Sequence, residues 1–246
     1  MDGPAGTQAR DDHLASSQIA PPAHELDEYF ERMRPAVDDT VRKLATAEFR
    51  EDPIAGRKYS RTTSIISSAY KRHGAILHRA LLERLRDCAR LRVWIEDDFK
   101  LSHDSLRQVR IVERLDSLLS TQLPYGDRER TVRADIMVFD EESRSLRTYS
   151  VKRGNGSYDG GKRRIIHEEL VRTQMLLADY GCGLGLKPET SQAHIIFYYG
   201  LLSLPPPLAI AGDALDDHFR FPVREAIEVV NAYFVAQLTE IIEQDD

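Results

Sequence analysis

Two β-prone segments at the centre of the 246-residue chain constrain its fold more than any other feature. TVRADIMVFD (131–140) is rich in β-branched and aromatic residues, and LRTYSVKR (146–153) has the same character. The polar run DEESRS between them supplies a turn. The sequence therefore predicts an antiparallel hairpin in the middle of the chain.

Helical periodicity on both sides of the hairpin predicts the surrounding elements. The first helical segment is expected as two helices or as one helix kinked at Pro35, and RKYSRTTS (57–64) after it as a polar link. The expected helices lie at 25–52, 63–90, 102–119, 161–180 and 221–242, and further strands at 91–95 and 193–202. This order predicts an α/β protein with a central mixed β-sheet flanked by helices and an N-terminal helical region.

Three parts are expected along the chain. Residues 1–24 have the Pro, Ala and Ser-rich composition of a disordered tail without the apolar stretch of a secretory signal, 25–62 form the N-terminal helical region, and 63–246 form the domain that carries the hairpin.

The 41% hydrophobic residues are dispersed among charges, so no membrane span is expected and the protein is expected to be cytoplasmic. Two cysteines are too few for a disulfide framework or a thiolate zinc site.

Polar residues interrupt the β pattern of the hairpin at two places, Asp135 and Lys152. Because side chains alternate across a strand, Ser150 and Lys152 share one face, and the residue opposite Lys152 lies close to Arg133 or Asp135. A carboxylate is a hard oxygen ligand for Mg²⁺, and a nearby lysine can orient or deprotonate an attacking water. The pair is therefore a candidate centre for Mg²⁺-dependent phosphodiester hydrolysis.

With RADIMVFD (133–140) followed by SVK (150–152), the hairpin resembles that of the PD-(D/E)XK, restriction-endonuclease-like nuclease superfamily. The family's hairpin carries an aspartate and then an acid-x-Lys tripeptide on the paired strand. The resemblance extends over 63–200 as an order of elements. It implies the family's fold for residues 63–246, with Asp135 as a metal ligand and Lys152 beside the attacking water. Ser150 stands at the acid position, where a hydroxyl cannot replace an anionic ligand.

Some type II restriction endonucleases of this family also have Ser-x-Lys, with the missing glutamate on the following helix. Similarity to them implies that Glu168 or Glu169, which follow Lys152 by 16 and 17 residues, completes the metal site. At 100° per residue, Glu169 lies closer to the apolar stripe of its helix than Glu168 does, which favours Glu169. The alternative is that both glutamates are ordinary surface acids near a helix N-terminus, without a role in metal binding.

Further site residues follow from the resemblance and from two basic stretches. A looser similarity to an exonuclease-like branch implies Glu83 as a further metal ligand and Gln174 as a DNA contact, although Glu83 lies far from the apolar stripe of its helix. The basic residues expected to contact DNA phosphates are Arg61, Lys71, Arg72, Arg153, Lys162 and Arg163.

The function expected from these residues is Mg²⁺-dependent cleavage of double-stranded DNA by a type II restriction endonuclease. The resemblance implies a homodimer or higher oligomer, because cutting both strands of a near-symmetric site needs two active centres. One alternative keeps the fold without catalysis, as a DNA-binding protein. Another is a structural or interaction protein that assembles through its terminal helices, with Asp135 and Lys152 as ordinary surface charges.

Overall fold

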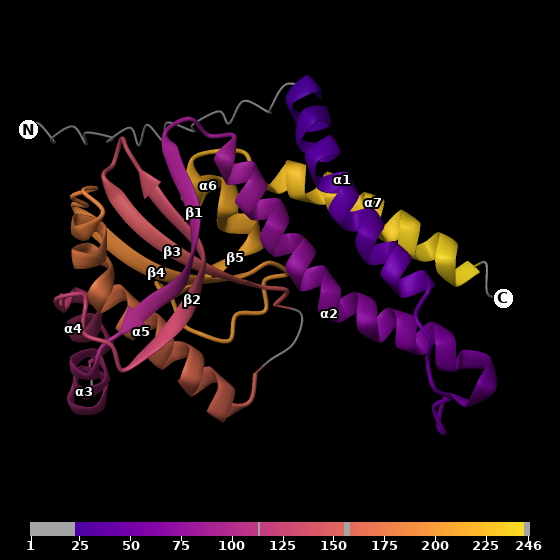
Figure 1. Ribbon diagram of the computed structural model, residues 1–246, viewed down its shortest axis with the longest axis horizontal. Helices are drawn as coiled ribbons and strands as arrows, with labels where there is room; N and C mark the ends of the chain where they lie inside the picture. Colours follow the sequence, from indigo (N-terminus) through magenta and orange to yellow (C-terminus); the bar gives the residue numbers. More distant parts are fainter. Residues whose placement is uncertain (1–22, 113, 155–157, 244–246) are drawn as a thin grey trace, which may run out of the picture.

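The computed structural model describes residues 23–112, 114–154 and 158–243 (Figure 1). Along the chain, the elements are α1 (Ala23–Ala45), α2 (Gly56–Arg86), β1 (Leu91–Leu101), α3 (His103–Ile111), α4 (Leu115–Ser120), β2 (Arg130–Asp140), β3 (Ser145–Lys152), α5 (Gly160–Gly183), β4 (Thr190–Phe197), β5 (Ala209–Ala211), η1 (Gly212–Ala214), α6 (Leu215–Phe219) and α7 (Arg224–Glu243). The expected tail falls almost wholly outside the described residues, and Ala23 and His24 already belong to α1.

One mixed sheet contains the strands of the described residues, in the order β1-β2-β3-β4-β5. The central hairpin is confirmed: β2 pairs antiparallel with β3, from Ile136 opposite Tyr149 to Asp140 opposite Ser145. β1 is antiparallel to β2, whereas β4 is parallel to β3 and β5 is parallel to β4. The predicted α/β class, a mixed sheet flanked by helices with helices at the N-terminus, is therefore confirmed.

Helices cover both faces of this sheet (Figure 1). Ile136 and Val138 of β2 belong to the apolar cluster that contains α1, α2 and α7. Met137 and Phe139, the alternate residues of the same strand, pack on the α5 side with Leu177. Successive side chains of β2 therefore point to opposite faces of the sheet, as the sequence pattern predicted, and contribute to the apolar cluster on each face.

The N-terminal region differs from the prediction at its second helix. α1 is a single helix with Pro35 inside it. α2 begins at Gly56, so the predicted polar link at 57–64 is wrong, and the helix runs unbroken through the expected boundary at residue 62. The Asp52 carboxylate accepts hydrogen bonds from the backbone N–H groups of Ile54 and Ala55 just before the helix begins. Such local side-chain bonds allow a helix to start in a polar segment.

Three other expectations need correction. The predicted helix at 102–119 is two helices, because Val112 has an extended backbone (φ −101°, ψ 117°). β1 continues to Leu101, beyond its expected end at residue 95, so the acidic residues 96–98 lie inside the strand. Short β5 was not predicted, since its three residues are too few to show a period.

None of the helices within the described residues is long and apolar enough to cross a lipid bilayer.

Candidate active site

The candidate site lies at the open end of the hairpin, where the antiparallel strand pairing of β2 with β3 ends at Ile136 and Tyr149. A cavity of about 440 Å³, which we call the hairpin cavity, opens at this point. It lies among β2, β3 and α5, and its polar or charged lining residues include Arg130, Thr131, Arg133, Asp135, Thr148, Ser150, Lys152, Glu169 and Thr173. The fold thus brings three predicted site residues from the hairpin and one from α5 to a single cavity.

Asp135 is held from both faces of the sheet. On the cavity side, the hydroxyl of Ser150 donates a hydrogen bond to Oδ2 of Asp135 at 3.1 Å. From α2, Nε2 of His78 lies 3.0 Å from the backbone oxygen of Asp135, which fixes Nε2 as the donor because a carbonyl can only accept. The carboxylate remains 29% exposed, with Nε of Arg133 at 3.9 Å from Oδ1. Asp135 therefore has a fixed backbone and an accessible carboxylate.

Lys152 lies two residues beyond Ser150 on the same strand and lines the same cavity as Asp135. If the register of the hairpin continued, Ser150 would be opposite Asp135 and Lys152 opposite Arg133. Lys152 also pairs with Phe197 of β4, and its backbone oxygen accepts a hydrogen bond from Tyr198 N at 2.9 Å. The ammonium group thus extends from a backbone that the neighbouring parallel strand immobilises.

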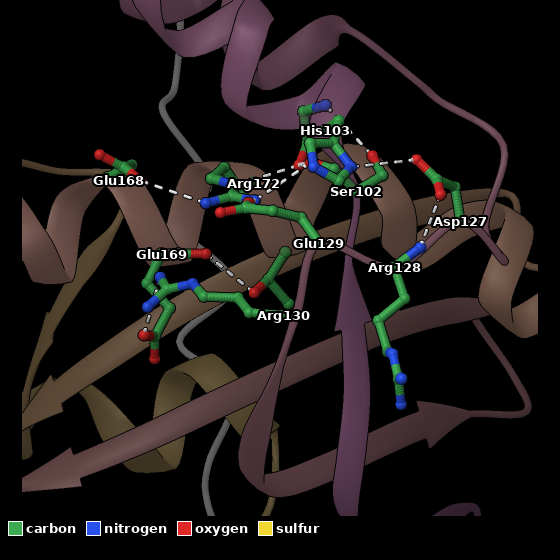
Figure 2. A network of polar contacts seen from close by, with 11 residues as sticks. Ser102, His103, Asp127, Arg128, Glu129, Arg130, Glu168, Glu169 and Arg172 are labelled. Carbon is green, nitrogen blue, oxygen red and sulfur yellow. Dashed lines mark hydrogen bonds and ion pairs between the residues drawn. The ribbon is translucent and has the colours of Figure 1, made fainter.

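The two glutamates of α5 have different surroundings (Figure 2). Glu169 lines the hairpin cavity and forms a loose ion pair with Arg130, at 3.5 Å between Oε2 and Nη2. Glu168 instead pairs with Arg172 of its own helix, at 3.2 Å. Glu169 is therefore the α5 carboxylate that lines the same cavity as Asp135 and Lys152.

Arg172 explains why Glu168 is turned away. Its side chain is 1% exposed, so its charge needs partners. It forms ion pairs with Glu129 and Glu168, and it donates to the hydroxyl of Ser105 at 3.1 Å and to the carbonyl of Ser102 at 3.1 Å (Figure 2). This network ties α5 to α3 and leaves Glu168 with a structural role.

Two residues implied by the looser resemblance are not brought to the hairpin cavity. Glu83 forms an ion pair with Arg86 on α2, at 2.9 Å, and lines neither cavity at the hairpin. Gln174 is buried; its amide nitrogen donates to Leu119 O at 2.8 Å and its oxygen accepts from Ala193 N at 3.1 Å. Gln174 thus joins α5 to the end of α4 and to β4, and no part of its amide remains for DNA.

The predicted DNA-contacting cations divide into two groups. Lys71, Arg153 and Lys162 line a second, larger cavity of about 730 Å³ that shares Arg133, Asp135 and Lys152 with the first. Arg72 and Arg163 are exposed outside both cavities. Nη2 of Arg61 donates to Ala45 O at 3.1 Å and so connects α2 to the end of α1.

Sequence reasoning missed several residues of these cavities. Arg130 and Arg133 face the candidate carboxylates; the position of Arg133 opposite Lys152 was a signal that could have found it. Helical spacing places Tyr70 on one apolar stripe with Ile66 and Leu77 and so predicts its burial, but 55% of Tyr70 is exposed and it lines the larger cavity. The prediction for Tyr70 was wrong because this part of α2 lines a cavity, where Cζ of Arg153 lies 4.5 Å from the ring centroid.

The hairpin cavity offers oxygen ligands, as Mg²⁺ requires. Among the residues that the structure describes, no group of three or more His, Cys, Asp or Glu side chains could hold a metal ion. Mg²⁺ usually keeps several waters and binds through one or two carboxylates plus substrate phosphate. Asp135 and Glu169 line the same cavity and supply two carboxylates of this kind, and the nearest Arg nitrogens lie 3.9 Å and 3.5 Å from them.

Searches against protein-family models, curated proteins and solved structures found no match for this chain.

Proposed function

We propose that this chain is a Mg²⁺-dependent endonuclease that hydrolyses phosphodiester bonds of double-stranded DNA, in the manner of type II restriction endonucleases. The observation that carries the proposal is the hairpin cavity, where Asp135, Ser150, Lys152 and Glu169 converge from β2, β3 and α5. A carboxylate pair, a hydroxyl and an ammonium group on the walls of one cavity are the groups that this hydrolysis needs.

Each residue has a separate role in the proposed reaction. Asp135 and Glu169 hold the metal ion, which when bound supplies Lewis-acid activation of a water and neutralises charge on the scissile phosphate. Lys152 orients the attacking water and contacts the phosphate. Ser150 keeps the Asp135 carboxylate in place through its hydrogen bond. Arg130 and Arg133, which neutralise the two acids in the protein alone, are then released toward the DNA backbone.

The resemblance noted in the sequence supports this proposal. The order α2, β1, β2, β3, α5, β4 is the order of elements implied by similarity to the PD-(D/E)XK superfamily. The Ser-x-Lys variant of that family has the missing carboxylate on the following helix, and this is consistent with Glu169 of α5 lining the same cavity as Lys152. The motif on the hairpin and the glutamate on α5 therefore both support a nuclease site of this kind.

A plasmid-nicking assay tests the proposal. In Mg²⁺, Asp135→Asn and Lys152→Ala should each lower the rate of conversion of supercoiled plasmid by more than about 100-fold. Asp97→Asn is the matched control, because Asp97 contacts the same Arg133 at 3.4 Å but does not line the hairpin cavity. Full activity in Asp135→Asn or Lys152→Ala would reject the assigned roles, and equal loss in Asp97→Asn would show a general effect of charge.

A catalytically silent DNA-binding protein is the second candidate. Ser150 at the family's acid position, together with the absence of a three-ligand cluster from the described residues, favours it. Such a protein would bind duplex DNA at low salt without any Mg²⁺-dependent nicking. Nicking that disappears in EDTA and in Asp135→Asn excludes this candidate.

Cleavage of both strands of a near-symmetric DNA site further implies a homodimer. Light scattering after gel filtration should then give twice the 28.0 kDa mass of the chain.

A further inference from the structure

The larger cavity beside the hairpin has a chemistry that the proposed hydrolysis does not explain. We call it the α2 groove; it lies between α2, the end of β3 and the start of α5. Its lining consists of Tyr70, Lys71, Gly74, Ala75, His78, Arg133, Asp135, Val151, Lys152, Arg153, Tyr158 and Lys162. Among these described residues Asp135 is the single carboxylate, so the groove beyond the active site is basic.

Aromatic rings and cations are interleaved along this groove. Cζ of Arg153 lies 4.5 Å from the ring centroid of Tyr70 and 5.5 Å from that of Tyr199, whose rings are 55% and 46% exposed. Nζ of Lys162 lies 4.2 Å above the ring of Tyr158. Cation–π contacts of this kind hold long, flexible side chains in defined positions. The groove thus presents ordered positive charges beside exposed rings.

Arg153 also has a binding capacity that the described residues do not use. Its Nε atom is shielded from solvent and has no hydrogen-bond partner there. A shielded donor without a partner has a free-energy cost, and a movement of the side chain onto a bound acceptor would remove it. Arg153 directly follows Lys152, so a phosphate next to the scissile one would lie within its range.

The helix wall of the groove is kept open by a glycine. Gly74 lies in the interior of α2, where glycine costs about 1 kcal/mol relative to alanine. A Cβ added there would meet Cγ of Arg153 at 4.0 Å, which is ordinary contact, so burial does not demand glycine at this position. The missing side chain instead widens the groove beside the Arg153 side chain.

A second exposed tyrosine continues the pattern along α2. Tyr59 precedes Tyr70 by 11 residues, which is three helical turns, and so lies on the same face about 16 Å away. It is 55% exposed, and Nζ of Lys58 lies 5.1 Å from its ring centroid. This half of α2 extends beyond the sheet (Figure 1). An aromatic and basic track therefore leads away from the active site.

Exposed rings can stack only on bases that are not already stacked inside a duplex, whereas phosphates are accessible in both single and double strands. We propose that the α2 groove binds an unpaired nucleic-acid strand adjoining the scissile phosphate, with a base stacked on Tyr70 and a phosphate on Arg153. This inference rests on the proposed nuclease function and adds to it a preference for duplex DNA that carries a single-stranded arm next to the cleaved bond.

Fluorescence anisotropy tests the binding step separately from cleavage. A labelled single-stranded oligonucleotide of about 12 nucleotides and the blunt duplex of the same sequence are titrated with the full chain in EDTA, where no hydrolysis occurs. Tyr70→Ala should weaken single-strand binding by about 5-fold to 100-fold, the range of one base–aromatic stack, and leave the duplex affinity unchanged. Tyr70→Phe should keep the affinity, because it retains the ring.

Leu184→Ala is the matched control, since Leu184 is an equally exposed apolar residue (53%) at the far end of α5. No loss of single-strand affinity in Tyr70→Ala, or equal losses for single strand and duplex, would overturn the assignment. If blunt and armed duplexes are both cut but Tyr70→Ala cuts them equally well, the strand site fails and the nuclease function stands. If nothing is cut while binding depends on Tyr70, the nuclease function fails and the strand site stands.

Discussion

The hydroxyl of Ser150 donates a hydrogen bond to the carboxylate of Asp135 across the open end of the hairpin, at 3.1 Å. In the family that this hairpin resembles, an acid usually occupies the position of Ser150. Here the serine orients the carboxylate opposite to it, and the second carboxylate of the cavity comes from Glu169 on α5. The site therefore depends on the relation between a strand and a helix that are separated in the sequence.

Ser150→Ala should weaken the site without abolishing it. The change removes the hydrogen bond that orients Asp135, and loss of a partner that orients a metal ligand typically costs 10-fold to 100-fold in metal affinity or activity, so we expect about that range. The measurement is the nicking rate as a function of Mg²⁺ concentration, whose half-maximal value should rise. Ser120→Ala, a change at an exposed serine of α4, should leave the curve unchanged. An unchanged curve in Ser150→Ala would contradict a positioning role.

Glu169→Gln and Glu168→Gln should have opposite consequences although the residues are neighbours. Glu169→Gln removes a carboxylate of the cavity and should lower plasmid nicking by more than about 100-fold, with little change in stability. Glu168→Gln removes one partner of buried Arg172 and should lower stability by about 1–3 kcal/mol while leaving nicking largely intact. Nicking rates and urea unfolding of both variants decide the question. A larger loss of activity in Glu168→Gln would reverse the assignment.

Gly154→Ala should destabilise the protein and impair the site. Gly154 has a φ of +69°, and a Cβ there would lie 2.7 Å from Cβ of Phe197 on β4. Strain at a positive φ and the forced separation of the strands should together cost roughly 2–5 kcal/mol. Because Gly154 follows Lys152 by two residues, that separation would also displace the lysine.

The matched control for this prediction is Gly185→Ala, measured by the same urea unfolding. Gly185 also has a positive φ, +75°, but a Cβ there would meet nothing within 4 Å. The Gly185→Ala variant should therefore lose only the stability that corresponds to the strain of a positive φ, about 1 kcal/mol. Equal losses in the two variants would show that the approach of Phe197 to Gly154 is not tight.

Stability should fall as the pH falls below about 6.5, because of buried His194 and half-buried His218. Burial is the main cause that lowers the pKa of His194 to about 4 and that of His218 to about 3. Both are neutral in the folded protein at pH values where the unfolded chain binds protons. Stability is thus fully present above the unfolded pKa and is lost toward acid, by up to about 1.4 kcal/mol per pH unit for each histidine.

Urea unfolding at about pH 7, 6 and 5 measures this loss. The double variant His194→Gln with His218→Gln cannot take up these protons, so its stability should change less over the same range. The two rings pack against each other at 5.2 Å between centroids, so protonation of one should also resist protonation of the other. An equal slope in the wild type and the double variant would assign the acid sensitivity to other groups, such as His73, whose pKa is also lowered by burial.

The sequence by itself determined the hairpin and the kind of residues at its open end. Alternation with period two fixes which residues of β2 and β3 share a face, and the DEESRS turn limits the register, so Asp135 was predictable near Ser150 and Lys152, although the residue opposite Lys152 stayed open between Arg133 and Asp135. The amphipathic patterns likewise determined most helices. These signals are local: each is contained within a few turns or one hairpin.

Only the tertiary structure decided which helical residues belong to the site. Glu168 and Glu169 are adjacent in the sequence, and the choice depends on Arg172, which is buried against α3 and takes Glu168 as a partner. Gln174 and Tyr70 were misplaced for the same reason, because whether a helical side chain is covered depends on what lies against that turn. The period of a helix gives the directions of its side chains, but the neighbours along each direction come from distant parts of the chain.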